Sequence, residues 1–280
     1  MRWTPGDRTN VEDLRGRSGG GFGIPLGIGG VLVLLVGSWL TGVNLFSLVG
    51  TGGSTSTDAS YSRPVSSTPA EEKKVDFVDA VMADVQHSWQ QRLGARYQPT
   101  KVRLFRNAIQ SACGLSESAT GPFYCPTDAR VYLDLEFFDE LQRRFHAPGD
   151  FAEAYVIAHE VGHHVQNLTG VIDREPFNGN ANERSVRVEL QADCYAGVWG
   201  HDAAQPGRAA QGRVELDPGD LEEALNAAAA IGDDRLQRMS TGHVMPDKFT
   251  HGTSAQRVSW FKRGMDTGDP AACDTFRNGQ

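Results

Sequence analysis

The residues best suited to chemistry lie in one short run, HEVGH at positions 159–163. On an α-helix, histidines four residues apart lie on the same face, so both imidazoles can reach one metal ion. Glu160 follows the first histidine and can reach a water molecule bound to that ion. Zinc lowers the pKa of such a water toward about 7, so a carboxylate can complete its deprotonation at neutral pH. The run therefore predicts a zinc site with His159 and His163 as ligands and Glu160 as general base.

A catalytic zinc usually has three protein ligands and one open position. The run ELQAD supplies the third candidate, Glu189, with Asp193 one turn further on the same helix face. We predict that Glu189 binds the metal and that Asp193 accepts a hydrogen bond from a ligand histidine. His164 is the competing ligand, but its side chain points about 100° away from that of His163, so we expect it to pack or hydrogen-bond locally. No third histidine follows at the metzincin spacing, so the pattern is of gluzincin type.

Hydrolysis of an amide also needs a donor to the oxyanion of the tetrahedral intermediate. Three histidines outside the motif are candidates, namely His201, His243 and His251. We favour His251, which stands in the run THGTSAQR on a loop immediately before a predicted helix. A surface or helix-capping histidine is the alternative interpretation. Tyr155 and Tyr195 rank lower.

Several helices must position these residues. Asp150 is the predicted N-cap, after Pro-Gly, of a helix that carries the motif and runs to about Leu168. The other predicted helices are Glu71–Tyr97 (ending near Gly94), Leu135–Phe145, Asn182–Trp199, Leu221–Met239 and one that follows Thr253. Alternating apolar residues predict strands at Lys101–Phe105 and Arg130–Leu135. We therefore expect a mostly helical α+β domain with a small sheet.

A different kind of sequence precedes this domain. Residues 18–57 contain no Asp, Glu, Lys or Arg, and residues 24–48 are long enough for the roughly 20 apolar residues of a bilayer-spanning helix. The stretch exceeds the apolar core of a typical signal peptide, so we interpret it as a retained transmembrane helix. The chain then divides into an N-terminal segment (1–23), the anchor (24–48), a flexible Gly/Ser/Thr/Pro linker (49–70) and a zinc metallopeptidase domain (71–280).

The basic residues around the apolar stretch predict its orientation. Arg2, Arg8, Arg15 and Arg17 precede it, and no Lys or Arg follows until Arg63. This asymmetry predicts a single-pass protein of the cell membrane, with the N-terminus cytoplasmic and the catalytic domain extracytoplasmic.

The four cysteines suit an exported domain. Cys113 and Cys125 bracket a loop of Gly, Ser and Pro, which a local disulfide would close. Cys194 and Cys273 then remain as a second pair. No C-x-x-C knuckle is present, so a zinc site made of these cysteines is disfavoured.

Charge limits the class of partner. Residues 71–280 carry 22 basic and 31 acidic side chains, which disfavours a nucleic-acid partner. We expect a peptide or protein substrate, and membrane contact through the N-terminal helix. The pattern indicates neither the oligomeric state nor the physiological substrate.

Long runs across nearly the whole chain resemble the bacterial membrane-anchored proteins called putative neutral zinc metallopeptidases. They include FAEAYVIAHEVGHHVQNLTG, ELQADCYAGVW and THGTSAQRVSWF. The resemblance implies a zincin-like catalytic domain and a distant similarity to membrane peptidases of the Ste24 and heat-shock HtpX type. Those peptidases carry a Thr-His-Pro segment. This chain has Thr250 and His251 at the matching positions, but Gly252 stands in place of the proline. In such peptidases an extended substrate pairs with an edge strand beside the active-site helix, and Arg130–Leu135 is the candidate strand.

These observations predict a membrane-anchored, zinc-dependent metallopeptidase that hydrolyses peptide bonds by a metal-activated water, with Glu160 as general base. Two alternatives remain. One is a membrane-tethered binding or assembly protein whose zinc site is structural or latent. The other is a zinc amidase that acts on cell-wall material with the same ligands.

Overall fold

The computed structural model describes residues 1–16, 65–172 and 179–277. More than half of the described chain is helical, with a small sheet, so the predicted mostly helical α+β fold is confirmed. The predicted anchor, residues 24–48, and most of the predicted linker lie outside the described residues. Within the described ranges, no helix has both the length and the apolar character needed to cross a membrane.

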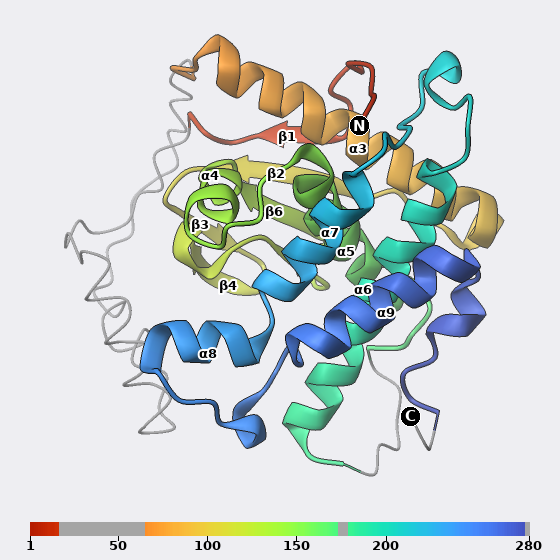
Figure 1. The fold of residues 1–280 in the computed structure, drawn as a ribbon. Helices are drawn as coiled ribbons and strands as arrows, with labels where there is room; N and C mark the ends of the chain where they lie inside the picture. The colour runs from red at the N-terminus through yellow and green to blue at the C-terminus, as the bar shows by residue number, and fades with distance from the viewer. Residues whose placement is uncertain (17–64, 173–178, 278–280) are drawn as a thin grey trace. The chain divides into compact units, whose positions relative to one another are not determined.

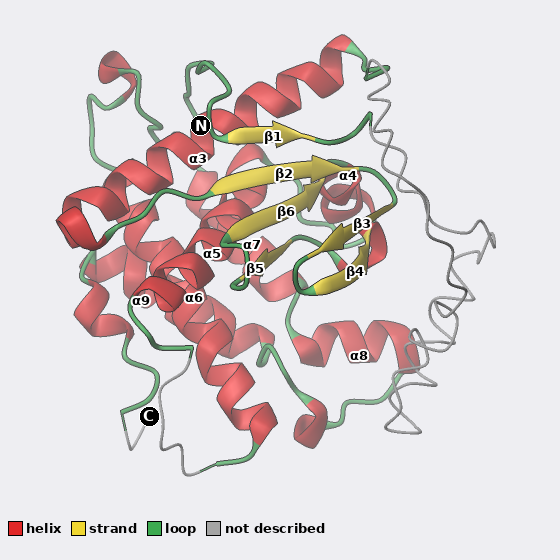
Figure 2. Ribbon diagram, turned by 180° about the vertical axis from the view of Figure 1, so that it is seen from behind, coloured by secondary structure: helices red, strands yellow, loops and turns green. Residues whose placement is uncertain are grey.

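A four-stranded sheet with the order β1-β2-β6-β5 forms one part of the domain (Figure 2). β1, β2 and β6 run parallel, and β5 is antiparallel to β6. Its strands are β1 (Val11–Asp13), β2 (Lys101–Phe105), β5 (Phe123–Cys125) and β6 (Arg130–Asp134); a separate hairpin consists of β3 (Ala108–Ser111) and β4 (Gly114–Glu117). Both edges of the sheet are therefore three-residue strands.

The predicted substrate-binding strand is not an edge strand. Strand β6 matches the predicted strand at residues 130–135, but it lies between β2 and β5 and is hydrogen-bonded to both. Its backbone groups are therefore already paired. The prediction missed β5 because three residues are too few to show a periodic pattern. That short strand is the edge of the sheet that packs against the motif-bearing helix.

The main helices lie close to their predicted positions. Helix α3 begins after Thr68, whose side chain accepts a hydrogen bond from the Glu71 amide, and it ends at Gly94 as predicted. Helix α9 has Thr253 as its N-cap, in a capping box with Gln256. The helices are α3 (Pro69–Leu93), α4 (Glu136–Arg143), α5 (Asp150–Leu168), α6 (Ala181–Ala203), α7 (Asp220–Ala230), α8 (Asp233–Thr241) and α9 (Ser254–Thr267).

Two helix predictions are wrong in detail. Asp150 is the first residue of α5 rather than its N-cap, which is Gly149 with a φ of 124°. The single helix predicted over residues 221–239 is broken into α7 and α8 around Gly232. A Cβ at Gly232 would lie 2.4 Å from the backbone nitrogen of Ser254, so the start of α9 leaves no room for a side chain at the break. Helix propensity in the alanine run could not reveal this tertiary contact.

Helix α5 is the central element of the domain (Figure 1). It packs against β5 and β6 and also against α3, α6 and α7, and α9 in turn packs along α6. One hydrophobic core spans these elements and contains the largest buried aromatic side chains, among them Trp89, Trp199 and Tyr155. The helix that carries the HEVGH run is therefore held on several sides.

The N-terminal residues belong to the same compact unit as the rest of the domain. Residues 1–16 and 65–280 form one unit by their contacts, and β1 is the parallel neighbour of β2. The predicted division, which separates residues 1–23 from a domain starting at residue 71, did not anticipate these contacts of residues 1–16. The charge and composition of the N-terminus do not indicate which surface it contacts.

Both predicted disulfides are present. Cys113–Cys125 joins the turn of the β3–β4 hairpin to the end of β5. Cys194–Cys273 joins α6 to the C-terminal segment. The described chain contains no free cysteine.

Candidate metal centre

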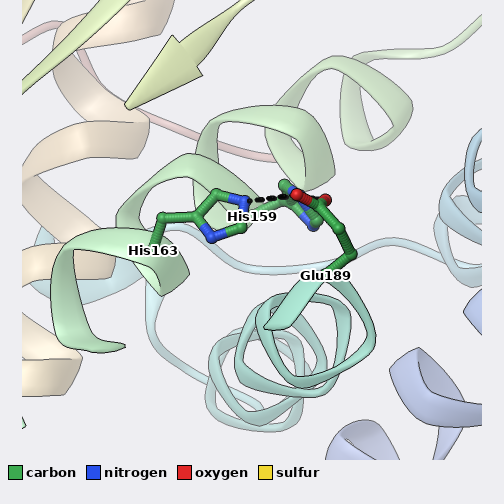
Figure 3. A group of neighbouring side chains, drawn as sticks. All are labelled: His159, His163 and Glu189. Carbon is green, nitrogen blue, oxygen red and sulfur yellow. Dashed lines mark hydrogen bonds and ion pairs between the residues drawn. The ribbon is translucent and has the colours of Figure 1, made fainter. Parts of the chain in front are cut away.

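Three potential ligand atoms converge between α5 and α6 (Figure 3). The Nε2 atoms of His159 and His163 lie 3.1 Å apart. One Glu189 carboxylate oxygen lies 3.1 Å from Nε2 of His159, and the other lies 3.5 Å from Nε2 of His163. The tertiary structure thus brings together the three residues that the spacing predicted.

Close packing of the two helices makes this convergence possible. A Cβ at Gly162 would lie 3.0 Å from the backbone oxygen of Ala192 on α6, tighter than most Cβ contacts. The absence of a side chain at Gly162 lets the helices approach within the motif itself. Glu189 and Asp193, three residues before and one after Ala192, then both face the histidine pair.

The outer nitrogen of His159 is held by a buried carboxylate. Nδ1 of His159 donates to Oδ1 of Asp193 at 2.8 Å. Arg257 of α9 donates to both oxygens of Asp193 at 2.9 Å, and the Tyr155 hydroxyl donates to the same group. Asp193 is fully buried and Arg257 is 2% exposed. This arrangement leaves Nε2 of His159 directed at the metal position.

His163 is oriented by an amide instead. Its Nδ1 donates to Oε1 of Gln166 at 2.9 Å. The Gln166 amide nitrogen donates to the Val188 carbonyl oxygen and to Oε1 of Gln191, which places Gln166 between α5 and α6. In both ligand histidines Nδ1 therefore binds an acceptor of the protein, and Nε2 is the nitrogen that faces the metal position.

The charges around the ligands favour a cation. Burial by itself lowers the pKa of His159, but Asp193 and Glu189 outweigh it and raise that pKa to about 10. Burial likewise opposes ionisation of Asp193, yet Arg257 and His159 lower its pKa to about 2. The His pair holds the pKa of Glu189 well below its usual value. The pocket therefore presents anionic oxygens and basic nitrogens at one point, which a proton or a metal ion would occupy.

Glu160 lies beside the histidine pair with different properties. Its side chain is buried, and burial raises the pKa of its carboxyl above the ordinary value, an effect that the nearby histidines oppose. A raised pKa makes a carboxylate a better proton acceptor near neutral pH.

The loop that carries His251 is fastened by Asp233. One oxygen of Asp233 accepts hydrogen bonds from the backbone nitrogens of Thr250, His251 and Gly252. The other lies 3.2 Å from Nδ1 of His251. Burial lowers and Asp233 raises the pKa of His251, with a net rise. A Cβ at Gly252 would lie 3.2 Å from a methyl carbon of Leu190, next to Glu189, so the loop lies against the ligand-bearing part of α6.

The other candidates have structural partners. As predicted, His164 packs locally, with Nδ1 at 3.0 Å from the Tyr124 hydroxyl and Nε2 at the Gln98 carbonyl oxygen. Tyr155 serves Asp193 rather than an open position. The remaining three are His201, which contacts the Met265 carbonyl oxygen, His243 on an exposed loop, and Tyr195, whose ring packs edge-on against Trp89.

Sequence reasoning missed three residues that position the site. Gln166 lies three residues after His163 on the same helix, so the i, i+3 spacing could have identified it. Arg257 and Asp233 had no comparable signal, because each acts across a tertiary contact with a distant helix or loop.

Fold and site together define a class. Two histidines from an H-E-x-x-H helix and one glutamate from the next helix form the His₂Glu donor set of zinc hydrolases. The chain belongs to the family described as putative neutral zinc metallopeptidase, whose model matches residues 1–276. The predicted resemblance is thereby confirmed, and the family supports a zinc peptidase at a coarse level.

The alignments with relatives cover different fractions of the chain. The uncharacterized protein YpfJ of Escherichia coli is 47% identical over 294 residues, which cover 99% of each chain. The uncharacterized protein Rv2575 of Mycobacterium tuberculosis is 48% identical over 185 residues, 64% of this chain and 63% of its own. No solved structure matches the chain.

Proposed function

We propose that the chain is a zinc-dependent peptidase in which His159, His163 and Glu189 hold the metal and Glu160 is the general base. The observation that carries the proposal is the convergence of two Nε2 atoms and a carboxylate within 3.1–3.5 Å. Two nitrogen ligands of a tetrahedral zinc, each about 2.0–2.1 Å from the ion, lie roughly 3.3 Å apart. The donor set therefore fits zinc in chemistry and in spacing. A bound zinc would polarise a substrate carbonyl and acidify a water molecule.

Glu160 supplies the proton transfer. Its buried carboxylate stands next to the ligand pair, and its raised pKa suits it to take a proton from the attacking water. The same carboxyl then returns the proton to the nitrogen of the leaving amine. Burial also keeps bulk water from competing for this proton.

We assign His251 to the oxyanion. Asp233 holds the loop and Nδ1 of His251, which leaves the opposite nitrogen, Nε2, as a donor. Because the neighbouring carboxylate raises its pKa, His251 retains a proton more readily near neutral pH. A donor held in place before the reaction stabilises the developing charge without reorganisation.

The substrate would bind along β5 rather than β6. β5 is the edge strand next to α5, and Tyr124 of β5 is hydrogen-bonded to Asn167 of that helix. An extended peptide that pairs with this edge would use backbone hydrogen bonds and so tolerate many side chains. This placement corrects the predicted strand while keeping the predicted mode of binding.

The location follows from chemistry outside the site. Two disulfides in one domain favour an oxidising compartment, so we place the catalytic domain outside the cytoplasm. The apolar stretch 24–48 favours association with the cell membrane.

The test is metal content and cleavage of a quenched peptide library by the full chain, with Glu160→Gln beside Glu153→Gln. Both glutamates lie on α5, but Glu153 belongs to an acidic cluster away from the ligands. We expect one zinc per chain in all three proteins and a loss of at least about a thousandfold in turnover only for Glu160→Gln. Zinc without cleavage in the wild type would favour the binding or assembly protein. Cleavage of cell-wall amides instead of peptides would favour the amidase.

A further inference from the structure

The N-terminal strand is integrated into the sheet by backbone hydrogen bonds. Val11, Glu12 and Asp13 of β1 are aligned with residues 102–104 of β2. The Val102 amide donates to the Asn10 carbonyl oxygen at 2.9 Å, and the Leu14 amide to that of Leu104 at 2.8 Å. Without β1, the backbone of β2 would be a free edge.

Arginines before the apolar stretch are paired with carboxylates that come after it. Arg8 lies 2.6 Å from Asp76 and 2.6 Å from Glu72, both on α3. Arg2 lies 2.8 Å from Glu215. These are two of the four arginines whose number predicted a cytoplasmic N-terminus; of the other two, Arg17 lies outside the described residues. The partners of Arg2 and Arg8 lie in the domain itself, so the presence of these two arginines has a structural explanation that does not involve membrane orientation.

Arg15 joins the two ends of the segment that contains the apolar stretch. Its side chain is 1% exposed and forms ion pairs with Asp13 at 2.6 Å and with Glu71 at 2.8 Å. It also donates to the Ser67 hydroxyl oxygen at 3.3 Å. The described residues stop at Gly16 and begin again at Val65. The Arg15 guanidinium group contacts residues on both sides of this gap.

A buried carboxylate depends on the N-terminal residues. Asp79 of α3 is 1% exposed and accepts hydrogen bonds from the backbone nitrogens of Arg8 and Asn10 and from the Asn10 amide. Removing these donors would leave the buried carboxylate of Asp79 without these hydrogen bonds, which is strongly unfavourable. The domain thus requires residues 8–10 for a satisfied interior.

We propose that residues 1–16 and residues 65–277 lie on the same side of the membrane. A stretch that crosses the bilayer once puts its flanks on opposite faces of a hydrocarbon core about 30 Å thick. The β1–β2 pairing and the contacts of Arg15 need those flanks to touch. Residues 1–16 and residues 65–277 therefore cannot lie on opposite faces of a bilayer, contrary to the orientation that the arginine count predicts.

Cysteine labelling of the full chain in spheroplasts tests this placement. Thr4→Cys and Gln91→Cys introduce exposed thiols before and after the apolar stretch, and the wild type, with its four cysteines in disulfides, is the blank. We expect a membrane-impermeant maleimide to label both variants to the same fraction of the value after lysis. Equal labelling of the two variants supports the proposal, whether both thiols are labelled before lysis or both only after it. Labelling of one variant only after lysis, with the other labelled before it, overturns the proposal.

A cross-link tests the pairing itself. Glu12 and Arg103 are register partners, and neighbouring strands about 4.8 Å apart satisfy the Cα separation of a disulfide. In Glu12→Cys/Arg103→Cys with a protease site inserted within residues 49–64, the two fragments should stay joined on a non-reducing gel. The Glu12→Cys single variant should separate completely. Separation in the double variant under oxidising conditions contradicts the proposal.

Neither readout uses catalysis. If the chain proves not to be a peptidase, the expected labelling pattern and cross-link are unchanged. If the two thiols are labelled on opposite sides, the expected zinc content and cleavage are unchanged. The two proposals can therefore fail separately.

Discussion

Two clusters of potential metal ligands each include residues of α5. One consists of His159, His163 and Glu189; the other, which we call the acidic trio, consists of Asp150, Asp220 and Glu223. In each, three potential ligand atoms lie within 4.8 Å of one another. Distance alone does not tell a metal site from a cluster of carboxylates.

The partners of the two clusters differ. The α-ammonium group of Met1 lies 2.9 Å from Asp150 and 3.3 Å from Asp220, and the Phe151 amide donates to Glu223. The acidic trio is therefore already bound to donors of the protein. At the metal centre, Asp193 and Gln166 bind only the outer nitrogens of the histidines. The inner nitrogens face each other and the Glu189 carboxylate, a position that a proton or a metal ion can occupy, and this feature identifies the site.

The largest expected effect is loss of the metal from one cluster only. Glu189→Gln should reduce zinc from about one per chain to less than a tenth, because it removes an anionic ligand. The matched change Glu223→Gln should leave zinc near one per chain. Metal analysis after dialysis measures both. Equal zinc loss in the two variants would show that the acidic trio also binds metal.

The next effect concerns the outer partners. Asp193→Asn should weaken zinc binding by about 10–100-fold, because the His159 tautomer loses its carboxylate acceptor. Asp150→Asn makes the same change in the acidic trio, at the start of α5, and should leave zinc affinity unchanged. Titration against a competing chelator measures the affinity. A weakening in both variants would mean that the total negative charge around the site, rather than the hydrogen bond to His159, determines zinc affinity.

Zinc affinity should also rise with pH. The pKa of His159 is about 10 because two carboxylates outweigh its burial, so an ion that binds Nε2 must displace a proton at neutral pH. Affinity should increase by about tenfold per pH unit for each displaced proton between pH 6.5 and 8.5. Chelator competition at several pH values tests this. An affinity independent of pH would show that His159 is already deprotonated when zinc binds.

The smallest effect belongs to the acidic trio's neighbour Glu153. Burial, with Asp150 and other nearby carboxylates, raises its pKa to about 7 against 4.5 for the ordinary group. The folded state then holds more protons than the unfolded state between these values, so stability falls as pH rises through this window. Glu153→Gln should raise Tm by about 2–4 °C at pH 8 and less at pH 5. A rise that is equal at both pH values would remove titration as the cause.

Much of the helical frame was predictable because its signals are local. Gly94 and Thr253 cap helices through contacts within a few residues, and these two predicted ends agree with the structure; the predicted start at Glu71 lies two residues after the observed one at Pro69. The break at Gly232 and the short strand β5 were not predictable. The break depends on a contact with Ser254, and the strand is too short to show alternation.

The sequence by itself determined the chemistry available at the site. The H-E-x-x-H spacing puts two imidazoles on one face of any helix that forms there, and it places Glu160 beside them. The ExxxD spacing of Glu189 and Asp193 likewise follows from the helical repeat. These relations hold within one helix, so they need no knowledge of the fold.

Only the tertiary structure decided which residues hold the ligands in place and where the N-terminus lies. Arg257 reaches Asp193 from another helix, and Arg15 reaches Glu71 across a long stretch of chain. Such pairs leave no periodic trace in a sequence, since a charged residue looks the same whether it faces solvent, a membrane or a buried partner. Their positions are set by the packing of elements that are distant along the chain.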